Sequence, residues 1–128
     1  MKPLVMTMTE LNIENYLRFR DRIIAMLDQN LYPIEWLDGR IARDEVHVLV
    51  DGDSCLLIER REFPSGAAEV HATVAVGDMH AIAGPLKDRA EEIGRLTGRV
   101  IASVESRMGW AKALPEYHVY QVTLRKVL

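Results

Sequence analysis

Residues 46–76, VHVLVDGDSCLLIERREFPSGAAEVHATVAV, decide the fold class of this chain. The first five residues are mostly β-branched, and the Asp-Gly pair after them tolerates the positive φ of a tight hairpin turn. A second strand is predicted from Ser54 to about Phe63, where a Pro-Ser-Gly turn interrupts it. A third strand is predicted over Ala68–Val76. The stretch therefore predicts three antiparallel strands joined as a meander.

The third strand alternates along its length, and the alternation predicts which side chains share a face. Val70, Ala72, Val74 and Val76 are expected on one face, and Glu69, His71, Thr73 and Ala75 on the other. This places Glu69 and His71 side by side, and both can carry a proton in catalysis.

Two helices are predicted before the meander. Residues 3–8 form a short apolar run that predicts an opening strand, and Thr9 is expected to cap the helix that follows. That helix is predicted over about residues 11–29, because one apolar stripe repeats there at steps of three and four. The stripe has a single polar break, at Arg20, and runs through Leu11, Ile13, Tyr16, Leu17, Arg20, Ile24, Leu27 and Leu31. Pro33 ends the helix, and residues 34–43 predict a short second one.

A third helix is predicted behind the break at Gly77-Asp78. Asp78 can cap it, and Pro85 is tolerated only in a first turn, so the helix is expected to start near residues 81–84. Gly98 is expected just past its C-terminal end.

Three more elements complete the chain. Val100–Val104 predicts a buried strand after a helical crossover, hence parallel to an earlier strand. Residues 108–114 predict a short helix, and the alternation over Tyr117–Val127 predicts a closing strand. The order β-α-α-β-β-β-α-β-α-β predicts an α/β fold with a mixed, mostly antiparallel sheet and helices on both faces. We expect a single domain over residues 1–128.

The composition excludes several classes of protein. Of the 128 residues, 16 are Lys or Arg and 19 are Asp or Glu, and the resulting charge of −3 offers no basic footprint for nucleic acid. No apolar stretch approaches the ~20 residues of a membrane span, and no signal peptide is visible. The lone Cys55 excludes an internal disulfide and lies in an apolar run, which indicates a buried structural thiol. The histidines are too scattered for a metal-ligand set. We therefore expect a cytoplasmic protein without membrane, nucleic-acid or metal partners.

The order of the elements resembles that of the GNAT superfamily of N-acetyltransferases over essentially the whole chain. In that family acyl-CoA lies in a V-shaped opening between the fourth and fifth strands, which correspond here to Ala68–Val76 and Val100–Val104. The pantetheine arm pairs with the backbone of the first of these strands, and the pyrophosphate rests on amides at the start of the next helix. The resemblance implies acetyl-CoA as the cofactor and an amine, of a small molecule or a protein, as the acceptor.

The family's phosphate-binding motif, Gln/Arg-x-x-Gly-x-Gly/Ala, aligns with residues 78–83, Asp-Met-His-Ala-Ile-Ala. Ala83 agrees with the motif, and Ala81 is small. Asp78 departs from it, because a carboxylate repels pyrophosphate and competes for the same amides. The resemblance implies five cofactor-binding residues, namely Val74, Val76, Gly77, Ala81 and Ala83.

Acyl transfer to an amine needs a base, an oxyanion donor and an acid. The resemblance places the acceptor against the strand Ala68–Val76, so Glu69 or His71 is the candidate base. The other interpretation is that both lie on an exposed strand edge and pair with neighbours such as Arg60. The family often draws its acid from a Tyr on the helix after the fifth strand. None stands there, and Tyr120 on the closing strand is the candidate.

The chain is also similar to the short acetyltransferase-like proteins of tailed phages and prophages. The likeness lies in the length, the eroded phosphate motif and the run Arg107-Met108-Gly109-Trp110-Ala111. It implies an alternative function, that of a non-catalytic structural or interaction protein of phage origin that keeps the fold. The exposed rim of a split sheet also predicts a homodimer.

Overall fold

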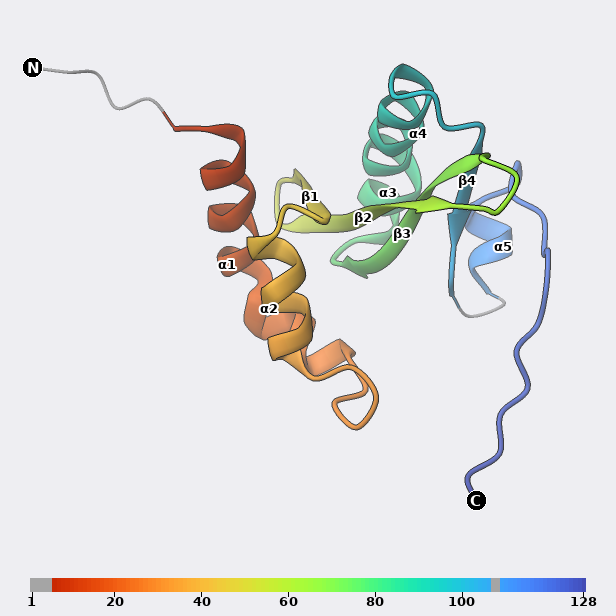
Figure 1. Ribbon diagram of the computed structural model, residues 1–128, viewed down its shortest axis with the longest axis horizontal. Helices are drawn as coiled ribbons and strands as arrows, with labels where there is room; N and C mark the ends of the chain where they lie inside the picture. Colours follow the sequence, from red (N-terminus) through yellow and green to blue (C-terminus); the bar gives the residue numbers. More distant parts are fainter. Residues whose placement is uncertain (1–5, 107–108) are drawn as a thin grey trace, which may run out of the picture.

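A four-stranded sheet of order β1-β2-β3-β4 lies at the centre of the computed structural model, which describes residues 6–106 and 109–128 (Figure 1). The strands are β1 (Val46–Asp51), β2 (Ser54–Glu62), β3 (Ala68–Val76) and β4 (Ile101–Val104). β1, β2 and β3 are antiparallel, and β4 pairs in parallel with β3. Asp51 faces Ser54 across a two-residue turn in which Gly52 has φ +56°. The predicted meander, hairpin and parallel strand are confirmed. The prediction that the parallel strand is buried is wrong, since Ile101 is exposed and the other residues of β4 are half-buried.

One face of the sheet is covered by α1 (Met8–Met26) and α2 (Ile34–Ala42) (Figure 1). Tyr16, Phe19 and Ile23 of α1 pack there against side chains of β1 and β2. Cys55 belongs to this core, is fully buried, and has its thiol pKa raised by that burial to about 11, as expected of a structural thiol. Both helices were predicted.

The start of α1 differs from the prediction. Thr7, not Thr9, is the N-cap, and it forms a capping box with Glu10 in which each residue's backbone N–H donates to the other's side chain over 3.1 Å. Met8 begins the helix, so the predicted opening strand is wrong at its C-terminal end, and residues 3–5 lie outside the described residues.

The predicted apolar stripe of α1 is only partly the buried one. Leu11 and Leu17 are exposed, whereas the polar Asn12 is buried. The Asn12 side chain donates to the Val46 carbonyl over 2.9 Å and accepts from the Val48 N–H over 2.8 Å. The amide thus satisfies the free backbone edge of β1, and this contact sets the rotation of the helix.

The other face is covered by one continuous helical segment and a short helix. The segment consists of α3 (Met79–Ala81), the π-helical turn η1 (Ile82–Leu86) and α4 (Lys87–Leu96), and the short helix is α5 (Trp110–Ala113). The segment starts at Met79, earlier than predicted, because the wider η1 turn accommodates Pro85 inside the helix. Gly98 follows the C-cap Thr97 with φ +75°, as predicted. The prediction of helices on both faces is confirmed.

The strict alternation predicted for β3 is wrong. The register against β2 shifts between Ala72 and Val74, so Thr73 is the extra residue of a β-bulge. Val70, Ala72 and Ala75 consequently pack on the α4 side, while Val74 and Val76 pack on the α1 side. A bulge moves all later side chains to the opposite face.

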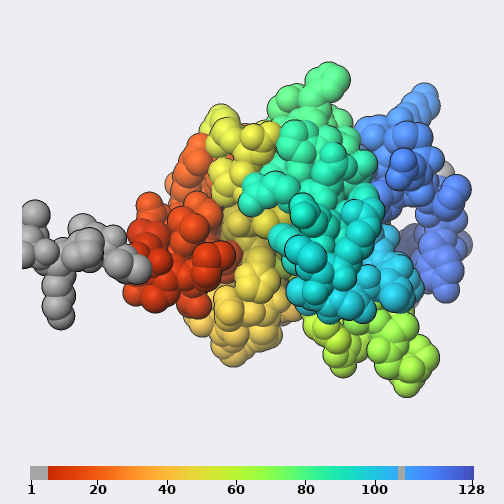
Figure 2. Space-filling view, turned by 90° about the horizontal axis from the view of Figure 1, so that it is seen from above, coloured from red at the N-terminus to blue at the C-terminus, as the bar shows by residue number. Residues whose placement is uncertain are grey.

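The predicted closing strand over Tyr117–Val127 is also wrong. Residues 118–128 have no regular secondary structure, and all of them are exposed. Alternation is a local pattern, whereas a strand needs a partner, and no strand within the described residues pairs with this segment. The segment stands away from the rest of the molecule (Figure 2).

No helix in the described ranges is long and apolar enough to cross a membrane.

Candidate functional site

The pairing between strands β3 and β4 ends midway along β3. Their pairing runs from Glu69 opposite Ile101 to Ala72 opposite Val104, where β4 ends, while β3 continues to Val76. The Thr73 bulge lies where the pairing stops, and its hydroxyl is buried without a hydrogen-bond partner. Among the described strands, none pairs with this side of Thr73–Val76. The backbone edge of the second half of β3 is therefore free to meet a ligand.

An apolar pocket lies beside this opening, between the sheet and the segment η1–α4. Its walls include Ala72, Ala102 and Val104 from the strands, and Trp110, Leu114 and Tyr117 from the C-terminal part. Its cavity volume is about 30 Å³, which is room for about two water molecules. Trp110, Leu114 and Tyr117 would have to move to admit an acyl chain.

The turn after β3 depends on Gly77. Its φ is +118°, and a Cβ at this position would lie 2.7 Å from the Cα of Ser54 and would also overlap the Ser54 side chain. The Asp78 N–H donates to the Ser54 hydroxyl over 2.9 Å, which fixes the turn against the start of β2. Asp78 occupies the N-cap position of α3, but its carboxylate makes no capping hydrogen bond, so the predicted cap is wrong.

The structure places the five predicted cofactor residues in two environments. Gly77 is exposed in the turn, and Ala81 and Ala83 are half-buried in the helical segment that the turn opens. Val74 and Val76 pack their side chains into the core on the α1 side, so β3 presents only their backbone to the opening.

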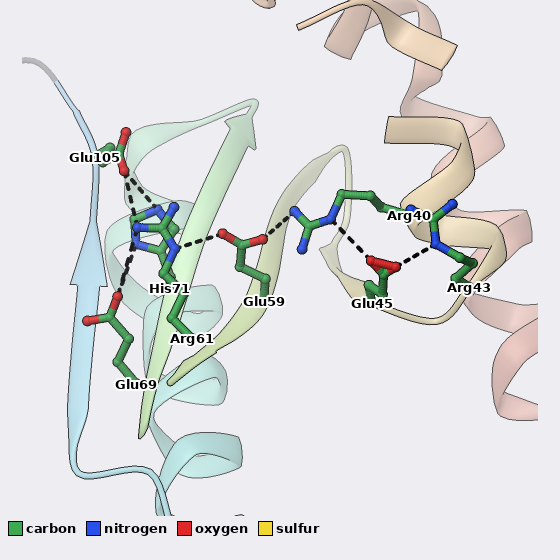
Figure 3. A network of polar contacts seen from close by, with 8 residues as sticks. All are labelled: Arg40, Arg43, Glu45, Glu59, Arg61, Glu69, His71 and Glu105. Atoms are coloured by element: carbon green, nitrogen blue, oxygen red, sulfur yellow. Dashed lines mark hydrogen bonds and ion pairs between the residues drawn. The ribbon is translucent and has the colours of Figure 1, made fainter. Parts of the chain in front are cut away.

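A polar network crosses the opposite face of the sheet, from α2 to β4 (Figure 3). Glu59 of β2 is buried and pairs with Arg40 of α2, and it also accepts from Arg61 over 2.9 Å. Burial alone would raise the pKa of Glu59, but the hydrogen bonds from Arg40 and Arg61 outweigh it and lower that pKa. Arg61 lies 3.2 Å from Glu105 and 3.9 Å from Glu69.

His71 lies in the middle of this network (Figure 3). It is 2% exposed, its Nδ1 lies 2.7 Å from the Ser103 hydroxyl, and its Nε2 lies 3.6 Å from the Glu105 carboxylate. Glu69 is 4.0 Å away from Nδ1. Burial, and to a smaller extent the nearby Arg61 cation, lowers the pKa of His71 from its usual value of 6.5. The imidazole is therefore neutral at pH 7 and able to accept a proton.

The structure brings Glu69 and His71 together on one face, as predicted, but both are buried rather than on an exposed edge. Arg60 is not their partner, since it pairs with Glu62. Tyr120 is 93% exposed in the C-terminal segment and does not join them.

Sequence reasoning missed Glu59, Arg61, Ser103 and Glu105. Glu59 and His71 are direct cross-strand partners, and so are His71 and Ser103. The register that pairs them depends on turn lengths and on the parallel placement of β4. The sequence offered one signal for such residues, namely an ionisable residue at an inward-facing position of a predicted strand.

No protein-family model matches the sequence, and no curated protein matches it. Solved structures do share its fold. One is the crystal structure of a predicted acetyltransferase with acetyl-CoA from Clostridium acetobutylicum, with a TM-score of 0.58 and 11% identity over 96% of this chain and 92% of that one. Another is an acetyltransferase of Trypanosoma brucei, with a TM-score of 0.52 and 14% identity over 98% and 97% of the two chains. The chain is thus similar to these acetyltransferases in its whole architecture, and its α/β fold is GNAT-like.

Proposed function

We propose that the chain binds acyl-CoA in the opening between β3 and β4 and transfers the acyl group to an amine. The observation that carries the proposal is the end of β3–β4 pairing at Ala72 and Val104, which frees the backbone edge of Thr73–Val76. The fold neighbour that was crystallised with acetyl-CoA supports the same ligand class. The acceptor is a small-molecule or protein amine, as the resemblance implies.

The residues around the opening fit the pantetheine arm of the ligand better than its pyrophosphate. Free backbone groups of Thr73–Val76 would bind the pantetheine arm as an added strand does. The first turn of the helical segment would offer the N–H groups of residues 79–81 to the pyrophosphate, since the Ile82 N–H already donates to the Asp78 carbonyl over 3.0 Å. The Asp78 carboxylate opposes the charge of that group, so the affinity should be modest.

The acceptor would lie on the face that holds the His71 network. Attack of the amine on the thioester carbonyl of bound acyl-CoA would form the C–N bond, and the C–S bond would break to release CoA as a thiolate that takes its proton from water. As the amine loses its proton to the Ser103 oxygen, the Ser103 proton would move to Nδ1 of His71, 2.7 Å away. The Glu69 and Glu105 carboxylates, at 4.0 and 3.6 Å from the ring, would stabilise the imidazolium.

A second candidate function is a non-catalytic protein, of the phage-derived kind, that keeps the fold as an interaction module. Two observations favour it. Asp78 places a carboxylate beside the phosphate position, and aromatic and aliphatic side chains leave only about 30 Å³ in the pocket.

Thermal unfolding with acetyl-CoA separates these functions. A ligand at about 100 times its Kd should stabilise the chain by ~2.7 kcal/mol, whereas the same concentration of ADP should give a smaller shift. Release of free CoA thiol in the presence of a panel of primary amines then reports transfer.

A matched pair of variants tests the proposed base. His71→Gln should slow thiol release by about 10² or more and keep the shift with acetyl-CoA, whereas His118→Gln in the exposed C-terminal segment should change neither. A shift with acetyl-CoA supports the first function. No shift at millimolar acetyl-CoA contradicts the first.

A further inference from the structure

The proposed function determines which end of the ligand reaches the apolar pocket. With the pyrophosphate at the first turn of α3, the pantetheine arm would run along β3 from Val76 back to Thr73. The thioester end would then arrive where the pairing of β3 with β4 ends, at Ala72 and Val104. Both of these residues line the apolar pocket, so the acyl group would enter it.

One wall of this pocket comes from α5 and the residues after it, beside β4 (Figure 1). Trp110 packs against the core on the α4 side, and Leu114 is 6% exposed. The Tyr117 hydroxyl donates to Glu91 of α4 over 2.8 Å, which holds the end of the wall against that helix. The wall therefore consists of three bulky side chains that are packed or hydrogen-bonded in place.

The space that this wall leaves is small and apolar. The cavity volume of about 30 Å³ holds about two water molecules, or an acyl tail of about two carbon atoms. Each hydroxyl or ammonium group in the described lining already has a partner. Lys87 pairs with Asp88, Tyr117 with Glu91, and Ser103 with His71. A carboxylate at the end of an acyl tail would therefore be buried without a free cation in that lining.

We propose that Trp110, Leu114 and Tyr117 select the acyl group, and that the donor carries an uncharged acyl group of about three carbon atoms or fewer. This selection rests on the proposed function. A butyryl or longer chain would have to displace one of the three side chains, and forcing extra methylenes into a filled cavity is unfavourable. A succinyl group would bury its carboxylate without a partner. Acetyl and propionyl are the groups that fit.

Release of CoA thiol from a series of acyl-CoA donors, in the presence of the amine panel, measures this limit. The kcat/KM of the native chain should fall by about tenfold or more from propionyl-CoA to butyryl-CoA. Leu114→Ala enlarges the pocket and should raise the ratio of butyryl to acetyl kcat/KM by about tenfold. The matched control Leu124→Ala, in the exposed C-terminal segment, should leave that ratio unchanged.

A second variant tests the same wall without deleting a buried side chain. Tyr117→Phe keeps the ring and removes only the hydrogen bond to Glu91, so the wall should yield more readily to a longer chain. The butyryl to acetyl ratio should rise by about threefold or more, whereas Tyr120→Phe, at an exposed position, should leave it unchanged. This variant gives the answer if Leu114→Ala fails to fold.

Thermal unfolding with the same donors provides a readout that needs no acceptor. Acetyl-CoA or propionyl-CoA should raise the unfolding midpoint of the native chain more than hexanoyl-CoA or succinyl-CoA does. Equal shifts and equal rates for all donors, or equal ratios in the wall variants and their controls, overturn this proposal and leave the proposed function intact. A chain that no donor stabilises and that releases no thiol contradicts both.

Discussion

Nδ1 of His71 and the hydroxyl of Ser103 lie 2.7 Å apart across the parallel pair β3–β4. With the hydroxyl as donor, Nδ1 is an acceptor and the ring proton resides on Nε2, toward Glu105. Ser103→Ala removes the donor and should mix the two tautomers, which ¹⁵N chemical shifts of the imidazole report. Ser65→Ala, in the exposed turn between β2 and β3, is the control. An unchanged tautomer in Ser103→Ala would mean that Ser103 does not orient the ring.

The stability of the chain should fall as the pH drops below 6.5 because of His71. Burial, followed by the Arg61 cation, lowers the pKa of His71 in the folded chain below its usual 6.5. The unfolded chain therefore binds the proton at a higher pH, and protonation favours unfolding. His71→Gln should flatten this part of the profile in denaturant titrations between pH 8 and 5, and His118→Gln should leave the profile as in the native chain. Equal slopes for native and His71→Gln chains would contradict the assignment.

Arg40→Met should destabilise the fold by about 3 kcal/mol, because it removes one cation from the buried Glu59 carboxylate. Arg43→Met removes an exposed partner of Glu45 and should lower the free energy of unfolding much less. Urea unfolding of both variants gives the comparison. A double variant, Arg40→Met with Glu59→Met, should recover part of the loss. Equal losses of unfolding free energy for Arg40→Met and Arg43→Met would show that pairing with Arg40 of α2 does little to stabilise the buried Glu59.

Gly77→Ala should destabilise the chain by roughly 1–3 kcal/mol, because Ala is strained at φ +118° and its Cβ would overlap Ser54. Gly84→Ala is the matched control, since Gly84 has no neighbour within 4 Å of the added Cβ and no positive φ. It should be neutral or slightly stabilising. If the two midpoints of thermal unfolding fall equally, the turn is not as described.

Asp78→Arg should tighten acetyl-CoA binding by about tenfold, because it replaces a repelling carboxylate with a cation that pairs with phosphate. Calorimetric titration of native and variant chains measures the change, and the gain should shrink at high salt. Asp51→Arg, at the end of β1, has the same change of charge and should have little effect. An unchanged affinity in Asp78→Arg would mean that the pyrophosphate binds elsewhere or that the opening is closed to it.

Much of the fold was predictable because its signals are local. Each of these signals lies within a few residues: the Asp-Gly turn, the β-branched runs, and Gly98 just after the end of α4. The prediction failed where a distant contact decides. Asn12 turns α1 by binding β1, and the bulge at Thr73 moves Val74 and Val76 to the α1 face.

The candidate site was predicted only in part for the same reason. Glu69 and His71 are two residues apart on one strand, so alternation alone placed them together. Glu59 and Ser103 lie opposite His71 on the two neighbouring strands, and Arg40 of α2 joins the network through Glu59. No single stretch of sequence specifies that register or that helix position. The β-pattern of residues 117–127 had no partner within the described chain.

The most direct test of the central claim is the map of backbone amide chemical-shift changes on titration with acetyl-CoA. Ligand bound between β3 and β4 should shift the amides of Thr73–Val76 and of residues 79–83 most strongly. The amides of Gly52 and Asp53, in the β1–β2 turn, should stay in place. No changes at millimolar acetyl-CoA, or changes centred away from the opening, would contradict the account.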